Sequence, residues 1–294
     1  MKRLFLFILL CTIAKNILAQ GFSDSILTGF KGQHFYYLSN PSNNKLIIFL
    51  HGGVNNPYFK QPHTQITLTY LIENNAEFLQ QSTNNSFDIV APITTDSLNW
   101  LTKPQESFVK MREFIDSTLK KYNEVYISGF SDGGTGAYKI FYKNHDYFSG
   151  LIVFNGYPQH ENFYKSVNYS AITNKRIIFC STFKDNTIPY EFLLNEYCSQ
   201  KKTNANTYFY LTTGNHSFIN FQKNDLKEVF GILKGEINNT RTEPIQGYVK
   251  NDALITAYPF RKKITRKFNF GMATYEANRM QMKALKQKKM NLRR

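Results

Sequence analysis

Cysteine is scarce in this sequence, with three residues in 294. Cys11 falls in a hydrophobic stretch at the amino terminus, which leaves Cys180 and Cys198 for the rest of the chain. Neither has neighbours at metal-ligand spacing, so the pattern indicates no cysteine-based metal site. A disulfide between them is chemically possible if the protein is exported, and two separate thiols fit the sequence equally well.

Long apolar runs are also lacking, apart from one at the amino terminus. Met1–Arg3 is positively charged, Leu4–Leu10 is apolar, and Ala19 offers a small residue at a cleavage point. This pattern is typical of a secretory signal peptide over residues 1–19, and the run is too short for a transmembrane helix. A large residue precedes Cys11, which argues against a lipid anchor there. We therefore expect a secreted or periplasmic protein without a transmembrane segment.

Acidic residues are outnumbered, with 21 Asp and Glu against 36 Lys and Arg and a formal net charge of +15. The excess lies near the two ends of the chain. Residues 250–294 hold 13 basic and two acidic residues, and the predicted leader holds three basic ones. The 20 basic and 19 acidic residues between them nearly balance. A neutral body gives no reason to expect a polyanionic substrate.

The carboxyl-terminal part, residues 236–294, is expected to be a polar linker followed by a basic tail. A strongly basic segment can hold a protein to an anionic surface such as acidic polysaccharide or lipid head groups, and a solvated extension is the alternative. Phe268 and Phe270 among basic residues weakly suggest stacking on nucleic acid. An exported protein rarely needs this, so we expect no specific nucleic-acid partner.

Short apolar runs alternate with amphipathic segments from residue 33 onward. Continuous runs of this length favour parallel strands buried on both faces. The predicted strands are His34–Leu38, Leu46–Leu50, Phe87–Ala91, Val125–Ser128, Leu151–Phe154, Arg176–Cys180 and Thr207–Leu211. Predicted helices begin at Pro104 and span Glu191–Lys201 and Phe218–Leu233. This alternation predicts an α/β fold over residues 20–235, with a mostly parallel sheet and helices on both faces.

One turn in this pattern combines a strand, a central serine and a helix that begins with small residues. The sequence Gly129-Phe130-Ser131-Asp132-Gly133 follows a predicted strand and precedes a predicted helix. This is the arrangement of a nucleophile elbow, in which a sharp turn exposes the serine hydroxyl. Side chains at Gly129 and Gly133 would collide with neighbouring backbone in such a turn. An ordinary strand–helix turn that happens to contain a serine is the alternative.

An acid and a base follow two later strands. Asp185 comes directly after the strand that ends at Cys180, and His216 comes directly after the strand that ends at Leu211. Parallel strands bring their carboxyl ends to one edge of the sheet, so we expect Ser131, Asp185 and His216 to meet there. Serine needs a neighbouring base and the base needs an orienting carboxylate, which predicts a catalytic triad.

Each of the two partners also has a structural interpretation. Asp185 could cap the helix that follows Pro189, and a lone histidine such as His216 is more often a satisfied loop or core residue. The order of the three residues along the chain, each after a strand, favours the triad over these separate explanations.

The oxyanion formed in acyl transfer needs backbone N–H donors. The usual donors are the residue after the nucleophile, here Asp132, and one in the loop after an early strand, here Gly53 in His51-Gly52-Gly53. We expect His51 to brace that loop rather than to take part in the chemistry. A flexible turn is the alternative explanation of the two glycines.

These residues together resemble the α/β-hydrolase superfamily over residues 30–234, and secreted carboxylesterases of the feruloyl or acetyl esterase type most nearly. The resemblance implies that Ser131 is the nucleophile, His216 the base and then the acid, and Asp185 the residue that orients it. Val54 in place of a third glycine departs from the hormone-sensitive-lipase-like pattern. The short stretch between Leu151 and Arg176 leaves no room for a large lid.

The expected function is therefore hydrolysis of small or carbohydrate-linked carboxylic esters, with no metal or organic cofactor implied. Trp100, Tyr157 and Tyr190 are candidates for an exposed rim that stacks on aromatic or sugar rings, with core packing as the alternative. Other interpretations are a serine peptidase or acyltransferase of the same fold, or a non-catalytic protein that binds surfaces through its tail.

Overall fold

A computed structural model describes residues 23–31, 33–53, 75–95, 98–119, 121–157 and 169–238. All of them belong to one compact unit. The predicted signal peptide and the basic tail lie outside the described residues, so both stay predictions.

The described chain is organised around one eight-stranded sheet of order β1-β2-β4-β3-β5-β6-β7-β8. The pairs β1–β2 and β2–β4 are antiparallel, and every other pair is parallel. The predicted mostly parallel sheet is therefore confirmed. The strands are β1 (Ser23–Phe30), β2 (Gln33–Ser39), β3 (Lys45–Leu50), β4 (Phe87–Pro92), β5 (Glu124–Phe130), β6 (Gly150–Phe154), β7 (Arg176–Thr182) and β8 (Thr207–Thr212).

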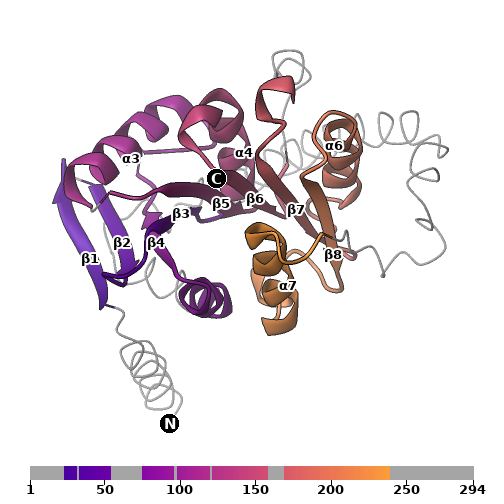
Figure 1. Ribbon diagram of the computed structural model, residues 1–294, viewed down its shortest axis with the longest axis horizontal. Helices are drawn as coiled ribbons and strands as arrows, with labels where there is room; N and C mark the ends of the chain where they lie inside the picture. Colours follow the sequence, from indigo (N-terminus) through magenta and orange to yellow (C-terminus); the bar gives the residue numbers. More distant parts are fainter. Residues whose placement is uncertain are drawn as a thin grey trace, which may run out of the picture. The chain divides into compact units, whose positions relative to one another are not determined.

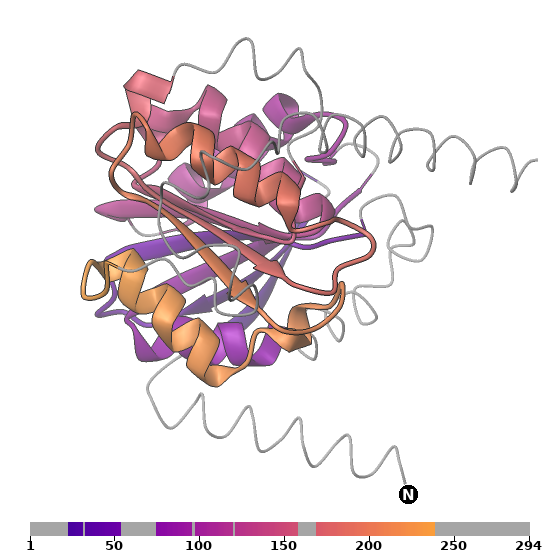
Figure 2. The same cartoon turned by 90° about the vertical axis from the view of Figure 1, so that its right-hand side faces the viewer.

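Helices cover both faces of this sheet, as the alternating pattern predicted. One face carries α3, α4 and α6, and the other carries α7 and an unlabelled purple helix over residues 75–84 (Figures 1 and 2). The bounds are α3 (Pro104–Thr118), α4 (Asp132–Lys143), α6 (Glu191–Lys201) and α7 (Lys223–Lys234), with short 3₁₀ turns at His145–Tyr147, Tyr169–Ile172 and Phe218–Asn220.

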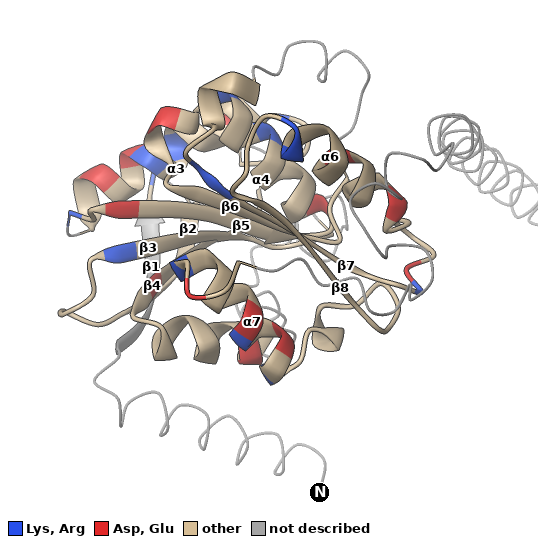
Figure 3. Cartoon of the chain, turned by 45° about the vertical axis from the view of Figure 1, so that its right-hand side comes forward, with Lys and Arg blue, Asp and Glu red and all other residues tan. Residues whose placement is uncertain are grey.

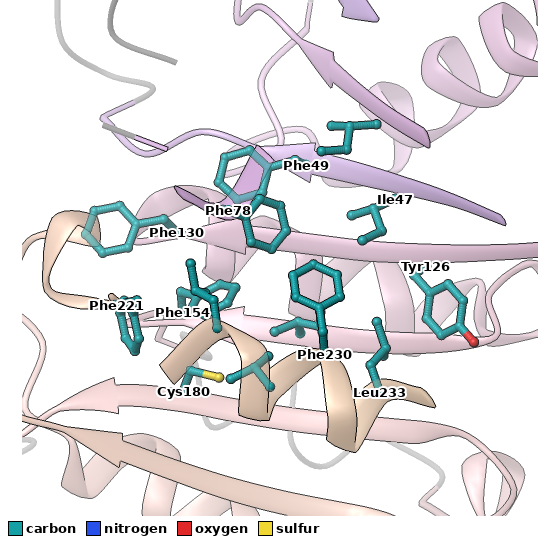
Figure 4. Packing of buried hydrophobic residues seen from close by; sticks show 14 of the residues in the cluster. Ile47, Phe49, Phe78, Tyr126, Phe130, Phe154, Cys180, Phe221, Phe230 and Leu233 are labelled. Atoms are coloured by element: carbon teal, nitrogen blue, oxygen red, sulfur yellow. The ribbon is translucent and has the colours of Figure 1, made fainter. Parts of the chain in front are cut away.

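The strands of the parallel part of the sheet are buried because helices cover both of its faces (Figures 1 and 2). All residues of β4, β6 and β8 are buried. On the α7 face, aromatic rings fill the space between sheet and helix: Phe78 lies 4.9 Å from Phe49 and 5.6 Å from Phe230, between ring centroids (Figure 4). This close packing gives the strand ends that carry the site a rigid support.

Charged residues lie mainly on the helices and loops rather than on the strands (Figure 3). Both signs alternate along α3, where Arg112 and Asp116 pair across one turn at 3.2 Å. An exposed pair of this kind stabilises a helix by only about 0.3–0.5 kcal/mol. The alternation of basic and acidic residues along α3 agrees with the near balance of charge in the body of the sequence.

Two parts of the fold differ from the sequence prediction. The expected single helix Phe218–Leu233 is wrong, because a 3₁₀ turn ends at Asn220 and α7 begins only at Lys223. Gln222 and Asp225 form a capping box, in which each side chain accepts a hydrogen bond from the other residue's backbone N–H and so starts a new helix. The edge strand β1 was not predicted from the sequence.

Candidate active site

Ser131 occupies the sharp turn between β5 and α4, with φ 56° and ψ −120°. Such a backbone is strained for any residue with a side chain and costs about 1–3 kcal/mol. A Cβ at Gly129 would lie 2.4 Å from the backbone of Gly133, and one at Gly133 would lie 1.9 Å from the carbonyl oxygen of Leu50. The expected steric need for both glycines is confirmed.

The structure brings Ser131, Asp185 and His216 together at the carboxyl ends of β5, β7 and β8. His216 Nδ1 lies 2.6 Å from Asp185 Oδ2, and His216 Nε2 lies 2.9 Å from Ser131 Oγ. A carboxylate only accepts hydrogen bonds, so Nδ1 carries the ring proton and donates it. Nε2 is then the acceptor for the serine hydroxyl, which is the arrangement that general-base activation requires.

Asp185 serves two purposes at once. Its Oδ2 meets the histidine, while its Oδ1 accepts the backbone N–H groups of Thr187 and Ile188 at 2.8 and 2.7 Å. These bonds shape the loop before α6 and hold the carboxylate in one orientation. The predicted capping role is wrong, because the N-cap residue of α6 is Tyr190 and it has no side-chain cap hydrogen bond; Asp185 instead shapes the preceding loop through Oδ1 and meets the histidine through Oδ2.

The two predicted oxyanion donors both lie near the nucleophile, Gly53 in the wall of the same cavity and Asp132 as the next residue of the chain. Gly53 has φ 69° and lines the same cavity as Ser131. Asp132 is the first residue of α4, where backbone N–H groups have no acceptor within the helix. A Cβ at Gly52 would come 3.0 Å from Ser131 Cβ, so the glycine lets this loop approach the serine closely. Their role as donors stays a prediction.

His51 holds the loop that contains Gly53, as expected. The N–H of Thr94 donates to His51 Nε2 at 3.2 Å, so the ring proton sits on Nδ1 and donates to Gly52 O at 2.8 Å. Burial lowers the pKa of His51 to about 4, and the bond to Gly52 opposes this only in part. A neutral, buried ring is suited to bracing the loop and poorly placed for proton transfer.

Trp100 is a second brace and not part of an exposed rim. Its side chain is fully buried, and its Nε1–H donates to the carbonyl oxygen of His51 at 3.2 Å. Of the two interpretations of Trp100, an exposed rim and core packing, the structure shows core packing, because α4 leaves a slot at Gly136, where a Cβ would meet the indole at 2.5 Å. Tyr157 and Tyr190 are partly exposed and stay candidates for ring stacking.

A cavity of about 230 Å³ opens beside the serine. Sequence reasoning assigned no role to Asn75, Ser217 or Phe218, although Ser217 and Phe218 directly follow the predicted base. Asn75 had no local signal, since only the packing of its helix brings it to the site. The lining residues are His51, Gly52, Gly53, Asn75, Phe130, Ser131, His216, Ser217 and Phe218.

Three other questions from the sequence concern a disulfide, a metal site and a membrane-spanning helix. No disulfide joins Cys180 to Cys198, and burial raises the pKa of the Cys180 thiol. Within the described ranges, no group of three or more His, Cys, Asp or Glu side chains could hold a metal ion. No helix in this part of the chain is long and apolar enough to cross a membrane.

No protein family profile and no curated protein sequence matches this chain. Solved structures do match. The esterase Pf2001 of Pyrococcus furiosus is 15% identical with a TM-score of 0.55, over 75% of this chain and 94% of its own. The S-formylglutathione hydrolase of Staphylococcus aureus is 11% identical with a TM-score of 0.53, over 72% and 96%.

A third similar structure carries a different activity in its name. The acylaminoacyl peptidase of Pyrococcus horikoshii is 14% identical with a TM-score of 0.50, over 76% of this chain and 43% of its own. At these identities the likeness establishes the fold alone. The chain has the α/β-hydrolase fold, with the mostly parallel sheet and flanking helices described above.

Proposed function

We propose that this protein is a serine hydrolase that cleaves carboxylic esters through an acyl-enzyme on Ser131. The observation that carries the proposal is the continuous hydrogen-bond chain from Ser131 Oγ through His216 to Asp185, at 2.9 and 2.6 Å. Its direction, with the serine as donor and Nε2 as acceptor, is the one that nucleophilic attack needs.

In the first half of the reaction, Ser131 Oγ attacks the carbonyl carbon of the ester and its proton passes to His216 Nε2. The negative charge that develops on the carbonyl oxygen is stabilised by the N–H groups of Gly53 and Asp132, each worth about 3–4 kcal/mol of barrier. The bond from carbon to the alcohol oxygen then breaks, and the imidazolium of His216 gives its proton to the departing alcohol.

In the second half, a water molecule attacks the acyl group on Ser131. His216 takes a proton from the water, and the same two N–H groups stabilise the second oxyanion. The bond between Ser131 Oγ and the acyl carbon breaks, the serine regains its proton, and the acid leaves. Throughout, Asp185 stays ionised, orients the ring and stabilises the transient positive charge.

Ester chemistry is favoured over the alternatives by two of the similar folds, which bear the names of an esterase and an S-formylglutathione hydrolase. A peptidase is the second candidate, since the same fold occurs in an acylaminoacyl peptidase. An acyltransferase would use the same acyl-enzyme and a different acceptor. The finer proposal, an esterase of the feruloyl or acetyl type, is tested by comparing methyl ferulate with acetylated xylose.

The first experiment measures hydrolysis of p-nitrophenyl acetate and butyrate by the mature protein beside Ser131→Ala. Turnover by the wild type and background rates for the variant support the proposal. The control is Ser181→Ala, a buried serine on β7 whose hydroxyl has no hydrogen-bond partner among the described residues, which should keep full activity. A wild type that neither turns over these esters nor labels with a fluorophosphonate contradicts the proposed serine hydrolase. Cleavage of peptide p-nitroanilides without cleavage of the esters favours the peptidase.

Export and surface binding complete the proposal. The pattern of residues 1–19 supports cleavage after Ala19, which amino-terminal sequencing of the secreted protein tests. The +11 net charge of residues 250–294 supports binding to an anionic surface. Tyr208 donates to Asn238 at 3.1 Å, so a truncation should keep Asn238. The truncated protein should lose salt-sensitive retention on heparin or anionic vesicles, while its ester turnover is unchanged. Retention equal to that of the full chain contradicts the proposed role of the tail.

A further inference from the structure

The loop that carries His216 is closed at one backbone carbonyl, that of Asn215. The N–H of Ser217 donates to Asn215 O at 2.8 Å, which makes a tight three-residue turn with His216 at its centre. Asn220 Nδ2 donates to the same oxygen at 2.9 Å. Both donors belong to the loop itself and move with it, so neither sets where the loop stands relative to the sheet.

A side chain of the sheet reaches this carbonyl. The hydroxyl of Thr182, the last residue of β7, donates to Asn215 O at 2.8 Å. Thr182 is fully buried, and three residues later the chain reaches Asp185. Two backbone bonds also join the neighbouring segments, from Phe183 N to Thr212 O and from Lys184 N to Gly214 O. Those two bonds end at Thr212 and Gly214, whereas the hydrogen bond from Thr182 ends at Asn215, the first residue of the turn that carries His216.

Asn155, which follows β6, directs the proton of that hydroxyl. Its Nδ2 donates to Thr182 Oγ1 at 2.9 Å, so the single hydroxyl hydrogen is left to point at Asn215 O. Asn155 is fully buried at φ 42°, and its Oδ1 has no hydrogen-bond partner among the described residues. A left-handed backbone and an unsatisfied buried oxygen both cost stability, which points to a role beyond packing.

We infer that Thr182, oriented by Asn155, is a positioning residue that holds the His216 turn in register with Asp185 and Ser131. The inference rests on the proposed function, since it concerns the alignment of the same three side chains. Reacting groups lose about 10-fold to 100-fold in rate when displaced by an ångström, so a bond at the turn's anchor acts on kcat. Substrate affinity should change little, because Thr182 does not line the cavity.

The test compares Thr182→Val, which keeps the shape and removes the hydroxyl, with Thr182→Ser, which keeps the hydroxyl. The matched control is Thr207→Val, since Thr207 on β8 is equally buried and its hydroxyl has no hydrogen-bond partner in the described part of the chain. With p-nitrophenyl acetate, we expect kcat to fall about 10-fold to 100-fold in T182V with KM nearly unchanged. T182S should return kcat close to the wild-type value, and T207V should not alter it.

A second measurement needs no substrate. The proton on His216 Nδ1, bonded to Asp185, should give a far-downfield ¹H NMR resonance in the wild type. We expect T182V to broaden or lose this signal, and T182S and T207V to keep it. An unchanged signal and unchanged kcat in a folded T182V overturn the inference while leaving the proposed function intact. A wild type without ester activity refutes the proposed function, and the resonance still decides whether Thr182 positions the histidine.

Discussion

The carboxylate of Asp185 is fully buried, whereas the imidazole of His216 is 19% exposed, and the two meet at 2.6 Å between Oδ2 and Nδ1. Asp185 is thus enclosed by protein, whereas His216 faces the cavity. Oδ1 of Asp185 already accepts hydrogen bonds from two backbone N–H groups. These bonds fix the orientation of the carboxylate, so that Oδ2 faces the histidine. The ring that must exchange protons with substrate is held from its protected side.

Asp185→Asn is expected to keep the loop and lose the activity. Its retained oxygen still accepts the N–H groups of Thr187 and Ile188, while an NH₂ group would face His216 Nδ1. The ring would then carry its proton on Nε2 and could not accept that of Ser131. We expect kcat on p-nitrophenyl acetate to fall by about 10³-fold to 10⁴-fold with little change in the thermal midpoint. A loss of less than 10-fold would show that Asp185 does not set the tautomer.

Gly133→Ala should disrupt the elbow itself. The new Cβ would lie 1.9 Å from Leu50 O, a backbone atom that cannot move without shifting β3. We expect a loss of more than about 4 kcal/mol in the free energy of unfolding, or no folded protein. The matched control is Gly231→Ala in α7, whose Cβ would meet only the flexible end of Ile237 at 2.6 Å. Urea denaturation measures both, and equal losses would contradict the steric argument.

His51 should make the protein less stable as the pH falls. Burial lowers its folded-state pKa to about 4 from the usual 6.5. Above pH 6.5 both states hold a neutral ring, and between 6.5 and 4 only the unfolded state binds the proton. Each pH unit in that window therefore removes about 1.4 kcal/mol of unfolding free energy, or about 3 kcal/mol in total.

The measurement compares urea unfolding of the wild type and His51→Gln at several pH values from 7.5 to 4.5. Other groups titrate in both proteins, so the difference between the two curves isolates His51. We expect the variant to be less stable at pH 7.5 and the gap to narrow toward pH 4.5. A gap that stays constant would mean that folding does not change the pKa of His51.

The size of the cavity predicts a preference for short acyl chains. Its volume of about 230 Å³ is smaller than the roughly 300–1,000 Å³ of pockets that enclose drug-sized ligands, and two phenylalanines, Phe130 and Phe218, line it. We expect kcat/KM to be highest for p-nitrophenyl acetate or butyrate and to fall steeply for octanoate. A profile that rises with chain length would show that the acyl group binds elsewhere.

Much of this arrangement could be predicted because its signals are local. The elbow glycines, the strand before each functional residue and the helix Glu191–Lys201 can all be recognised within about ten residues of sequence. The break before α7 was missed because the apolar spacing continues through it, and only the capping box at Gln222 interrupts the helix. The sequence left Trp100 undecided between an exposed rim and the core, because nothing near it in sequence reveals the slot at Gly136.

The sequence by itself determined which residues follow which strands, and so that Ser131, Asp185 and His216 reach one edge of a parallel sheet. That follows from chain direction, since parallel strands all end at the same edge. Only the tertiary structure decided the contacts at that edge, including the bond from Thr182 to Asn215, which joins residues 33 apart. These contacts depend on β5, β6, β7 and β8 lying side by side in the sheet. The hydrophobic pattern of a sequence shows that a strand is buried, but it does not show which strands are its neighbours.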